Sequence, residues 1–493
     1  MVKSNKNTLF MADPPPTTIP REKMSFWHNK AIDLAVSGEE QVIYIYGKAG
    51  SGKTEVALHI CQAAKGRVQA GAGTGKAASN FNGPTVYAMF GWAHNEQNQS
   101  VLRANEQNKL DNLRKCYEHI DIFIIDEVNA MSAAELGLLD ETMGKIFNPH
   151  GKLKDQNGAV KPFGGKTMVF LGDAAQLRPV CGAAIYDSRV GSTGNGNRSG
   201  RKSYQSGQYK IRTTRGQTLY RECLSKNCIL LERSFQNKGL LQEIFDRVRD
   251  GKQTLADLDE LLYQRRRYPA VQTAYGIHYS NESCSIANWR DLWRTCTQQE
   301  PVQRLHISKA GYHTTGENDL IVSCLASIPA SQYNFAPDIL CIAEGCEVCL
   351  IMNFNVSAGL VNSTSGTVVK IIYNNADVKA LLDMQNPPPY CVIVNFPQFR
   401  GFLVGSERKC LFRNPHWVPL YRRKFLPQLV PSWVRKKQLP SSCYHEQFSL
   451  DLSRYITAHR AQGQTWKNRL VSVDLGLESP NNHVPSDIYS NIC

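Results

Sequence analysis

Long apolar runs are missing from this chain of 493 residues. None approaches the roughly 20 residues that a membrane-spanning helix requires. The opening stretch, residues 1–20, is polar and proline-rich, and it lacks the apolar core of a signal peptide. We therefore expect a protein of the nucleus or cytoplasm that is not secreted and has no transmembrane segment.

A disulfide framework is also missing, although the chain has 15 cysteines. Scattered cysteines in a protein without a secretion signal are expected to be reduced thiols. Cys346 and Cys349 have the spacing of zinc ligands, and Cys341 is nearby. However, they stand at the head of an apolar run and no second pair accompanies them. We expect no metal site there.

Negative charge is in short supply. The chain has 57 Lys and Arg against 43 Asp and Glu, a net charge of +14 and a pI near 9.1. This balance favours a polyanionic partner, either nucleic acid or an anionic membrane surface. The apolar content of 42% is typical of a globular protein, and the length allows two or three domains.

The most specific motif is GKAGSGKT at residues 47–54, which follows the strand-type run 42–46 and precedes a helical pattern. Its glycines let several backbone N–H groups point at a phosphate, and the helix N-terminus adds positive charge. Lys53 would bridge the outer phosphates and Thr54 would ligate Mg²⁺. This context disfavours a chance glycine loop. It predicts a nucleoside triphosphate site formed by Gly47, Ala49, Gly50, Ser51, Gly52, Lys53, Thr54 and Glu55.

Two further strands are predicted to end in polar residues. The apolar run 121–125 leads to Asp126 and Glu127, and the run 167–171 leads to Gln176. Buried parallel strands point their carboxyl ends at the ligand crevice of an open sheet. Asp126 would hold the magnesium through water, and Glu127 would deprotonate the attacking water. The Gln176 amide would contact the γ-phosphate or the water and report its loss.

Aromatic residues are interleaved with Lys76 in a stretch of small residues at 68–92. Such a pattern suits stacking on unpaired bases. By residue type alone, burial in the core is the favoured alternative. The aromatics are Phe81, Tyr87, Phe90 and Trp92.

The segment 187–221 is rich in Gly and Ser and strongly basic, and we interpret it as a mobile basic loop. A phosphate-tracking role and a solvated insertion without contacts are equally open for it. A second α/β unit is expected from residue 228, with a helix that ends at Gly251, a suitable C-cap. Arg233, just past its first strand, could reach the γ-phosphate. Residues 374–448 break the α/β rhythm and are typical of a small β insertion.

Six blocks, taken in this order, resemble the Pif/RecD-like DNA helicases of superfamily one: GKAGSGKT, GTGKAASNFNGPTVYAMFG, IIDEVNAMS, PFGGKTMVFLGDAAQLRPV, GLVNSTSGTV and ITAHRAQGQT. The resemblance implies an α/β fold of two RecA-like P-loop lobes with parallel sheets, and a small β-barrel-like insertion in the second lobe. The expected division is a mobile tail at 1–22, a first lobe at 23–227, a second lobe at 228–475 with the insertion at about 374–448, and a C-terminal tail at 476–493.

The resemblance also implies residue roles. Lys53, Thr54, Asp126, Glu127 and Gln176 keep the roles given above, and Arg233 is similar to the family's arginine finger. Gln462 and Gly463 would couple the DNA channel to the nucleotide. Channel positions of the family match Thr74, Tyr87, Phe90, Thr457 and His459, although the family usually has His in place of Tyr87.

Two features depart from the family pattern. Residues 24–33 offer no Gln to read adenine, and the end, residues 487–493, lacks the family's terminal Arg segment. The loss of an arginine finger can lower turnover by on the order of a thousandfold. The chain is thus similar to viral or transposon-borne copies truncated at the C-terminus.

The expected function is an ATP-dependent DNA helicase that uses ATP and Mg²⁺, moves 5′-to-3′ on single-stranded DNA and acts at DNA junctions, with a monomer favoured. One alternative is a catalytically weakened or inactive DNA-binding remnant. A small-molecule P-loop kinase is a weaker alternative, because neither the Gln176 block nor the basic charge serves a small acceptor.

Overall fold

The computed structural model describes residues 13–473 apart from gaps at 95–99, 103–105, 180, 188–206, 233–234, 236–238, 268–274, 279, 298–302, 314–322, 324, 329, 334, 357, 375–386, 405–406, 410–413, 428–443 and 462–470. The chain divides into two compact units, with the boundary between Arg267 and Tyr268. Among the described residues, the helices are all too short or too polar to cross a lipid bilayer.

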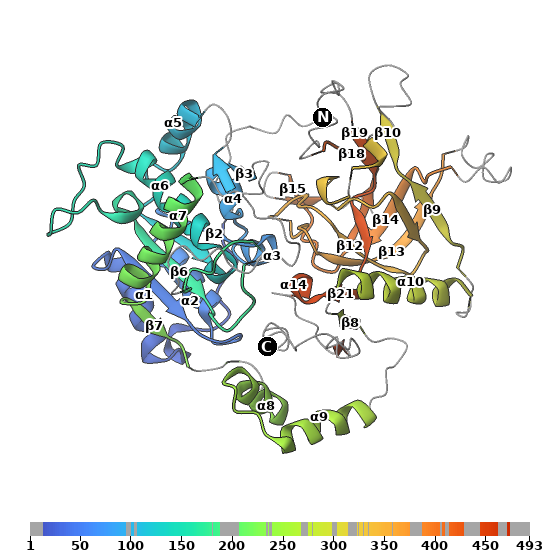
Figure 1. The fold of residues 1–493 in the computed structure, drawn as a ribbon, viewed down its shortest axis with the longest axis horizontal. Helices are drawn as coiled ribbons and strands as arrows, with labels where there is room; N and C mark the ends of the chain where they lie inside the picture. The colour runs from blue at the N-terminus through green and yellow to red at the C-terminus, as the bar shows by residue number, and fades with distance from the viewer. Residues whose placement is uncertain are drawn as a thin grey trace. The chain divides into compact units, whose positions relative to one another are not determined.

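The first unit, coloured blue to green in Figure 1, is built on a parallel sheet of five strands in the order β2-β5-β6-β1-β7. Successive side chains of a strand point to opposite faces, and both faces of this sheet are buried. Tyr44 and Phe123 pack into one core, whereas Ile43 and Ile124 pack into the other. The strands are β1 (Val42–Tyr46), β2 (Val68–Ala72), β5 (Ile122–Asp126), β6 (Thr167–Gly172) and β7 (Cys228–Leu230).

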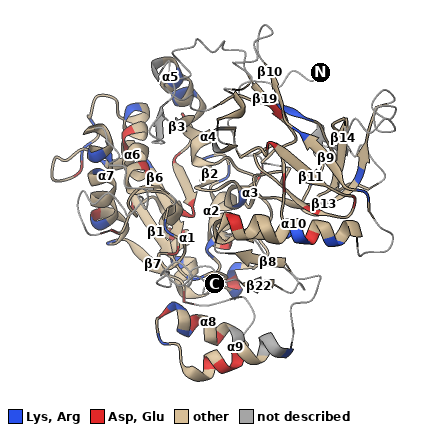
Figure 2. Ribbon diagram, turned by 45° about the vertical axis from the view of Figure 1, so that its right-hand side comes forward, with Lys and Arg blue, Asp and Glu red and all other residues tan. Residues whose placement is uncertain are grey.

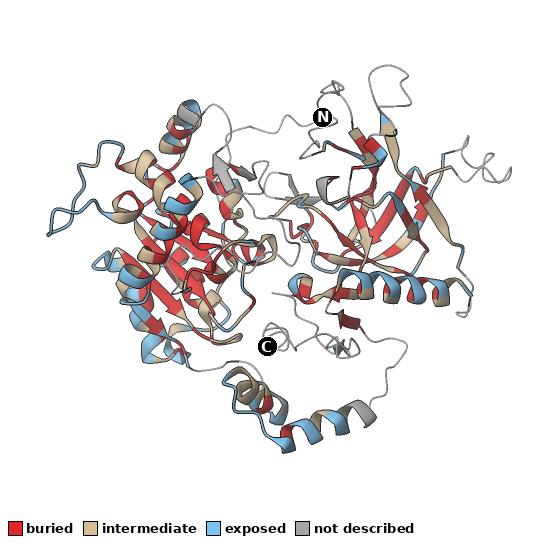
Figure 3. Cartoon of the chain, in the orientation of Figure 1, coloured by how far each residue is buried: buried red, intermediate tan, exposed pale blue. Residues whose placement is uncertain are grey.

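Helices cover both faces of this sheet, and its strands β2, β5, β6 and β1 are almost fully buried between them (Figure 3). In the edge strand β7, Ile229 is buried whereas Cys228 and Leu230 are exposed. Helices α1 and α2 contribute to one core, and α4 to α7 contribute to the other. A short hairpin of β3 (Trp92–His94) and β4 (Ser100–Leu102) also belongs to this unit. The helices are α1 (Phe26–Ser37), α2 (Lys53–Ala63), α3 (Gly75–Ser79), α4 (Val86–Phe90), α5 (Glu106–Cys116), α6 (Ala133–Phe147), α7 (Gly207–Leu219), α8 (Leu240–Arg249) and α9 (Leu255–Arg267).

Helix α7 corrects the expectation of a mobile basic loop over 187–221. Residues 188–206 lie outside the described part, but 207–219 are helical and packed on α6. Arg212 Nε lies 2.6 Å from Glu141 Oε2, and Arg215 Nε lies 2.7 Å from Asp140 Oδ2. A Cβ on Gly216 would lie 1.9 Å from the carbonyl oxygen of Ala133, so the two backbones touch. Arg212 and Arg215 are thus paired with acidic residues of α6.

Strand β7 differs from the expected start of a second lobe at residue 228. It pairs in parallel with β1, so it is the edge strand of the first sheet. Ile229 is buried there in the same core as α1 and α2. Pairing with β1 places β7 in the first unit, and this unit continues through α8 and α9 to Arg267. The helix expected to end at Gly251 ends two residues earlier, at Arg249, with Asp250 as its C-cap, and Gly251 follows with a φ of +68°.

The second unit combines a small parallel sheet with antiparallel sheets. Strand β8 lies between β21 and β22, parallel to both, and α10 contacts β8 and β21. The elements of this part are β8 (Tyr275–His278), α10 (Asn281–Thr297), β21 (Tyr455–Thr457), α14 (Ala458–Ala461) and β22 (Val471–Val473).

An antiparallel sheet with the order β17-β14-β13-β12-β20 forms the largest core of the second unit. The β region therefore begins well before the expected insertion at 374. Cys346 and Cys349 are buried in or beside β12, and burial raises the pKa of both thiols to about 12, which keeps them protonated. The strands are β9 (His306–Lys309), β10 (Gly311–His313), β11 (Ile339–Ile342), β12 (Glu347–Leu350), β13 (Ser365–Ile372), β14 (Cys391–Asn395), β15 (Phe402–Val404), β16 (Glu407–Lys409), β17 (Trp417–Leu420), β18 (Arg423–Phe425), β19 (Tyr444–Gln447) and β20 (Leu450–Leu452).

Candidate nucleotide site

The loop GKAGSGKT connects β1 to the first turn of α2. Gly50 and Gly52 have φ of +74° and +88°, a conformation that glycine adopts without steric cost. A Cβ on Gly47 would lie 2.5 Å from Ser51 Oγ and 2.8 Å from the carbonyl oxygen of Leu231. The glycines therefore allow a tight curl at the amino end of α2, where backbone N–H groups and the helix dipole favour an anion.

Polar atoms within this loop are available to a ligand. Lys53 Nζ donates to the carbonyl oxygens of Gly47 and Lys48, at 2.5 and 3.1 Å. These are carbonyls of its own loop, so an anionic ligand would compete for the same ammonium. Ser51 Oγ is fully buried and has no hydrogen-bond partner within the described part of the chain. A buried hydroxyl without a partner is costly, and a phosphate oxygen would satisfy it.

Two carboxylates stand at the end of β5. Asp126 is its last residue and is buried, and its Oδ1 accepts the backbone N–H of Glu127 at 2.8 Å. Glu127 has a φ of +54°, which is unusual for a residue other than Gly and costs backbone strain. Strain of this kind is retained where the direction of a side chain matters.

Burial raises the pKa of Asp126 and of Glu127 above the ordinary values, and the charge of Asp126 raises the pKa of Glu127 further. The Lys53 ammonium opposes both shifts but does not reverse them. Carboxylate and hydroxyl oxygens are ligands that Mg²⁺ prefers, and Asp126 and Thr54 carry such oxygens.

The third loop follows β6. Asp173 is fully buried at its start, and Gln176 is half-buried. The backbone carbonyl of Asp173 accepts the N–H of Gln176 at 3.1 Å, and its Oδ1 accepts the N–H of Ala175 at 3.1 Å. The turn that carries Gln176 is therefore organised around Asp173. Because β1, β5 and β6 are neighbours in a parallel sheet, their three loops emerge at one edge.

Glu55 has a different environment from the one predicted. Its carboxylate accepts hydrogen bonds from the backbone N–H and the hydroxyl of Thr18, at 2.9 and 2.5 Å, and from the N–H of Ile19 at 3.3 Å. The His59 ring bonds the Ile19 carbonyl at 2.8 Å. Within the expected mobile tail at 1–22, Thr18 and Ile19 are thus bound to α2. Residues 1–12 lie outside the described part.

The first helix of the unit also supports the phosphate loop, which the sequence did not reveal. The buried His28 ring lies 2.8 Å from the carbonyl oxygen of Ser51 and 2.6 Å from Ser25 Oγ. A Cβ on Gly52 would come within 2.8 Å of Phe235 and 3.0 Å of His28. His28 stands alone 19 residues before the motif, and no sequence pattern predicts its contact with the phosphate loop.

The aromatics of 68–92 are mainly core residues. Phe81, Phe90 and Trp92 are at most 2% exposed. The prediction that Phe90 contacts DNA is not supported, because its ring packs against Trp92, Tyr117 and Phe123. Tyr87 is partly exposed and its hydroxyl donates to Glu135.

The remaining predicted DNA contacts lie in both units. Thr74 caps α3 by accepting the N–H of Ala77 at 3.2 Å. In the second unit, Thr457 ends β21 and His459 is exposed in α14. Arg233, Gln462 and Gly463 lie outside the described residues. The structure therefore gathers Lys53, Thr54, Asp126, Glu127 and Gln176 at one sheet edge and leaves the other assignments as predictions.

Comparison with known proteins agrees with this arrangement. Residues 21–196, which contain all three loops, match the family model described as PIF1-like helicase. Over these residues the chain is similar to PIF1-like helicases.

Individual relatives extend the similarity beyond the first unit. The ATP-dependent DNA helicase Pif1 of Psychrobacter is 25% identical over 483 residues, which cover 88% of this chain and 62% of that protein. The ATP-dependent DNA helicase PIF1 of Saccharomyces cerevisiae is 30% identical over 154 residues, 30% of this chain and 16% of that protein. The chain thus spans less than two thirds of either relative.

A solved structure shows the same fold over nearly the whole chain. The crystal structure of a Bacteroides Pif1 bound to ssDNA aligns with a TM-score of 0.60 at 17% identity and covers 95% of this chain and 89% of that one. The similarity supports an α/β helicase fold with a parallel sheet and additional antiparallel sheets, as the Pif1-like sequence implied.

Proposed function

We propose that the protein is an ATP-dependent DNA helicase that hydrolyses ATP while it moves on single-stranded DNA. One observation carries the proposal: a phosphate-type loop, a strained Glu behind a buried Asp, and a Gln-bearing turn meet at one edge of a parallel sheet. This combination serves phosphoryl transfer to water, in which the protein positions groups and stabilises charge. The Pif1-like proteins that the chain resembles are named as ATP-dependent DNA helicases.

Each residue has a role that follows from its place. Lys53 releases its loop carbonyls and pairs with phosphate oxygens, and Ser51 and the loop N–H groups hold the same anion. Thr54 and Asp126 would hold Mg²⁺, and that ion would supply positive charge to the phosphate oxygens. Glu127 accepts a proton from the attacking water, a role favoured by its raised pKa and its fixed backbone.

Gln176 is proposed to contact the transferred phosphate or the water from the third loop. We keep Arg233 as the arginine finger, and Gln462 and Gly463 as coupling residues. Tyr87, Thr74, Thr457 and His459 are the proposed contacts to single-stranded DNA. The net charge of +14 supports a polyanionic strand as the partner.

The decisive experiment compares phosphate release by the wild-type protein with and without single-stranded DNA. We expect DNA to stimulate release and Lys53→Ala to abolish it. Lys65→Ala is the matched control, since Lys65 lies just past α2 and its exposed ammonium pairs with the exposed Asp13 carboxylate at 3.5 Å. Release by wild type that ignores DNA would favour the DNA-binding remnant. Release that survives Lys53→Ala would refute the site.

The direction of movement needs a separate substrate test. Duplexes with a single-stranded tail at either the 5′ or the 3′ end separate the two polarities, and we expect unwinding from the 5′ tail. Unwinding from the 3′ tail alone would overturn the 5′-to-3′ assignment and leave the ATPase assignment intact. Forked duplexes test the expected preference for junctions.

A further inference from the structure

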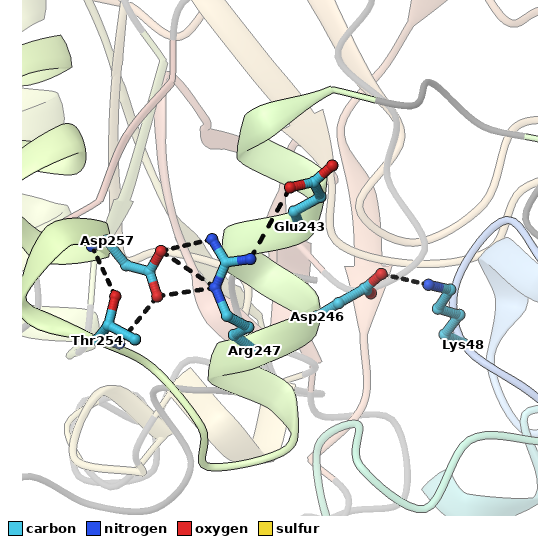
Figure 4. A network of polar contacts seen from close by, with 6 residues as sticks. All are labelled: Lys48, Glu243, Asp246, Arg247, Thr254 and Asp257. Carbon is cyan, nitrogen blue, oxygen red and sulfur yellow. Dashed lines mark hydrogen bonds and ion pairs between the residues drawn. The ribbon is translucent and has the colours of Figure 1, made fainter.

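Helix α8 contacts two of the three loops of the candidate nucleotide site through ion pairs of opposite polarity. Asp246 on α8 pairs with Lys48 of the phosphate loop (Figure 4). One turn later, the Arg249 guanidinium binds both carboxylate oxygens of Asp173, at 2.7 and 2.5 Å. Residues three apart on a helix share a face, so a single face of α8 reaches both loops.

The Arg249–Asp173 pair is the stronger of the two. The Asp173 side chain is fully buried and that of Arg249 is 13% exposed. Arg249 Nη2 also lies 3.4 Å from the Tyr46 hydroxyl, at the end of β1. A planar guanidinium that binds a carboxylate at two points fixes the orientation of both groups. The Asp173 carboxylate in turn accepts the N–H of Ala175, and its backbone carbonyl accepts the N–H of Gln176, so Arg249 is linked through one residue to the turn that carries Gln176.

The Lys48–Asp246 pair acts on the other loop. The Lys48 carbonyl is one of the two that accept hydrogen bonds from Lys53. Asp246 is held in place by Gln242, whose Nε2 lies 3.2 Å from its Oδ1. A change at Asp246 therefore reaches the loop that binds phosphate, but not the Gln176 turn.

Helix α8 is itself anchored on its other side. Arg247 makes three hydrogen bonds of 2.6 to 3.2 Å to the Asp257 carboxylate near the start of α9 (Figure 4). Asp257 also bonds Thr254 at the N-terminus of α9. Both helices carry residues of both charge signs (Figure 2). The two helices thus form a braced pair that presents Asp246 and Arg249 to the loops.

We propose that α8 is a positioning element for hydrolysis, in which Arg249 orients the Gln176 turn through Asp173 and Asp246 orients the phosphate loop through Lys48. This inference rests on the proposed function and adds two residues to it. It predicts that the Arg249–Asp173 pair and the Lys48–Asp246 pair affect different steps of the reaction. Loss of Arg249 lowers kcat, whereas loss of the Asp246 charge weakens nucleotide binding.

The test measures kcat, KM for ATP and the Kd of a fluorescent ATP analogue for Arg249→Gln, Asp246→Asn and Glu243→Gln. Glu243 is the control on the same helix, since it is 69% exposed and its carboxylate lies 3.9 Å from Arg247 alone. We expect Arg249→Gln to lower kcat about tenfold to a hundredfold with little change in Kd, because small misplacements of reacting groups have effects of that size. Asp246→Asn should raise Kd about two- to fivefold, as expected for a partly exposed pair. Glu243→Gln should resemble wild type.

Two further variants separate positioning from simple loss of folding. Arg249→Gln leaves a buried charge on Asp173, so the double variant Arg249→Gln/Asp173→Asn should melt higher than the single variant. If Arg249 acts through Asp173, the double variant has a kcat no lower than the lower of the two single variants. Arg249→Lys, which keeps the charge without the two-point contact, should give an intermediate kcat. Effects on kcat that multiply in the double variant would overturn the proposal.

Hydrogen exchange gives a readout that does not depend on hydrolysis. In Arg249→Gln the amides of Ala175 and Gln176 should exchange faster, while those of the phosphate loop stay unchanged. In Asp246→Asn the amides of the phosphate loop should exchange faster, while those of Ala175 and Gln176 stay unchanged. If the wild-type protein does not hydrolyse ATP in the presence of DNA, the proposed function fails. The hydrogen-exchange measurement still decides whether α8 holds the two loops. Equal exchange in all variants would overturn the positioning role.

Discussion

The contact between α6 and α7 can be tested by one substitution made at two glycines of the same helix. A Cβ on Gly137 would lie 2.1 Å from the carbonyl oxygen of Arg212 and 2.8 and 2.9 Å from its C and Cα atoms. A Cβ on Gly144 would have nothing within 4 Å. The clash at Gly137 is with backbone, which cannot rotate away, so Gly137→Ala must push α7 off α6.

The expected magnitude follows from comparing the two variants. Replacement of a helical glycine by alanine contributes roughly 0.5–1 kcal/mol of stability, and this gain is common to both. The difference between them is then the overpacking cost, about 1–3 kcal/mol. For a unit of this size that corresponds to roughly 2–12 °C in melting temperature. We expect Gly144→Ala to melt above wild type and Gly137→Ala to melt below Gly144→Ala.

The assay is a thermal melt of the three proteins, followed by far-UV circular dichroism and by calorimetry. Gly216→Ala disrupts the same helix contact from the α7 side, because a Cβ on Gly216 would lie 1.9 Å from the Ala133 carbonyl oxygen. Its melting temperature should be lowered as in Gly137→Ala. If Gly137→Ala melts with or above Gly144→Ala, the backbones are not in contact. The assignment of 207–219 as a packed helix would then fail.

Three other substitutions have defined outcomes. Burial opposes ionisation of Glu141, but Arg212 and Lys145 outweigh it and lower its pKa. A lowered carboxyl pKa contributes stability that is present above the unfolded value, about 4.3, and is lost as the pH falls through the folded value. The urea midpoint of Glu141→Gln should therefore lie below that of wild type at neutral pH and approach it in acid; a gap independent of pH contradicts this. Phe90→Ala should destabilise the first unit by about 3–5 kcal/mol without weakening single-stranded DNA binding by the folded protein, and weaker binding at an unchanged melting temperature would restore the DNA-contact prediction. Glu55→Ala should speed tryptic cleavage after Arg21 and Lys23, because it frees Thr18 and Ile19; an unchanged cleavage rate would show that other contacts hold the segment.

The nucleotide loops could be predicted from the sequence because each is a local pattern. A strand run, a glycine loop and a helix period are contiguous at 42–64, and apolar runs ended by polar residues mark β5 and β6. Parallel strands then place Lys53, Asp126 and Gln176 at one edge, since all strand ends of one direction meet there.

Predictions that depended on partners far along the chain were less successful. Arg212 and Arg215 are a basic run in the sequence, but their partners on α6 are 71 and 75 residues away. Glu55 stands in the phosphate motif, yet it binds Thr18, 37 residues earlier. The sequence shows the charge and polarity of each residue. It does not show which oppositely charged residue lies next to it in the folded chain.

By itself the sequence predicted which residues stand at the sheet edge: the loop glycines, the paired acids and the amide follow from residue type and spacing. Tertiary structure alone decided what surrounds them, namely β7 as the fifth strand of the first sheet and Arg249 on Asp173. The physical reason is the distance along the chain over which each kind of interaction acts. Backbone preferences act over a few residues, whereas burial and ion pairing depend on contacts between segments that only the folded chain brings together.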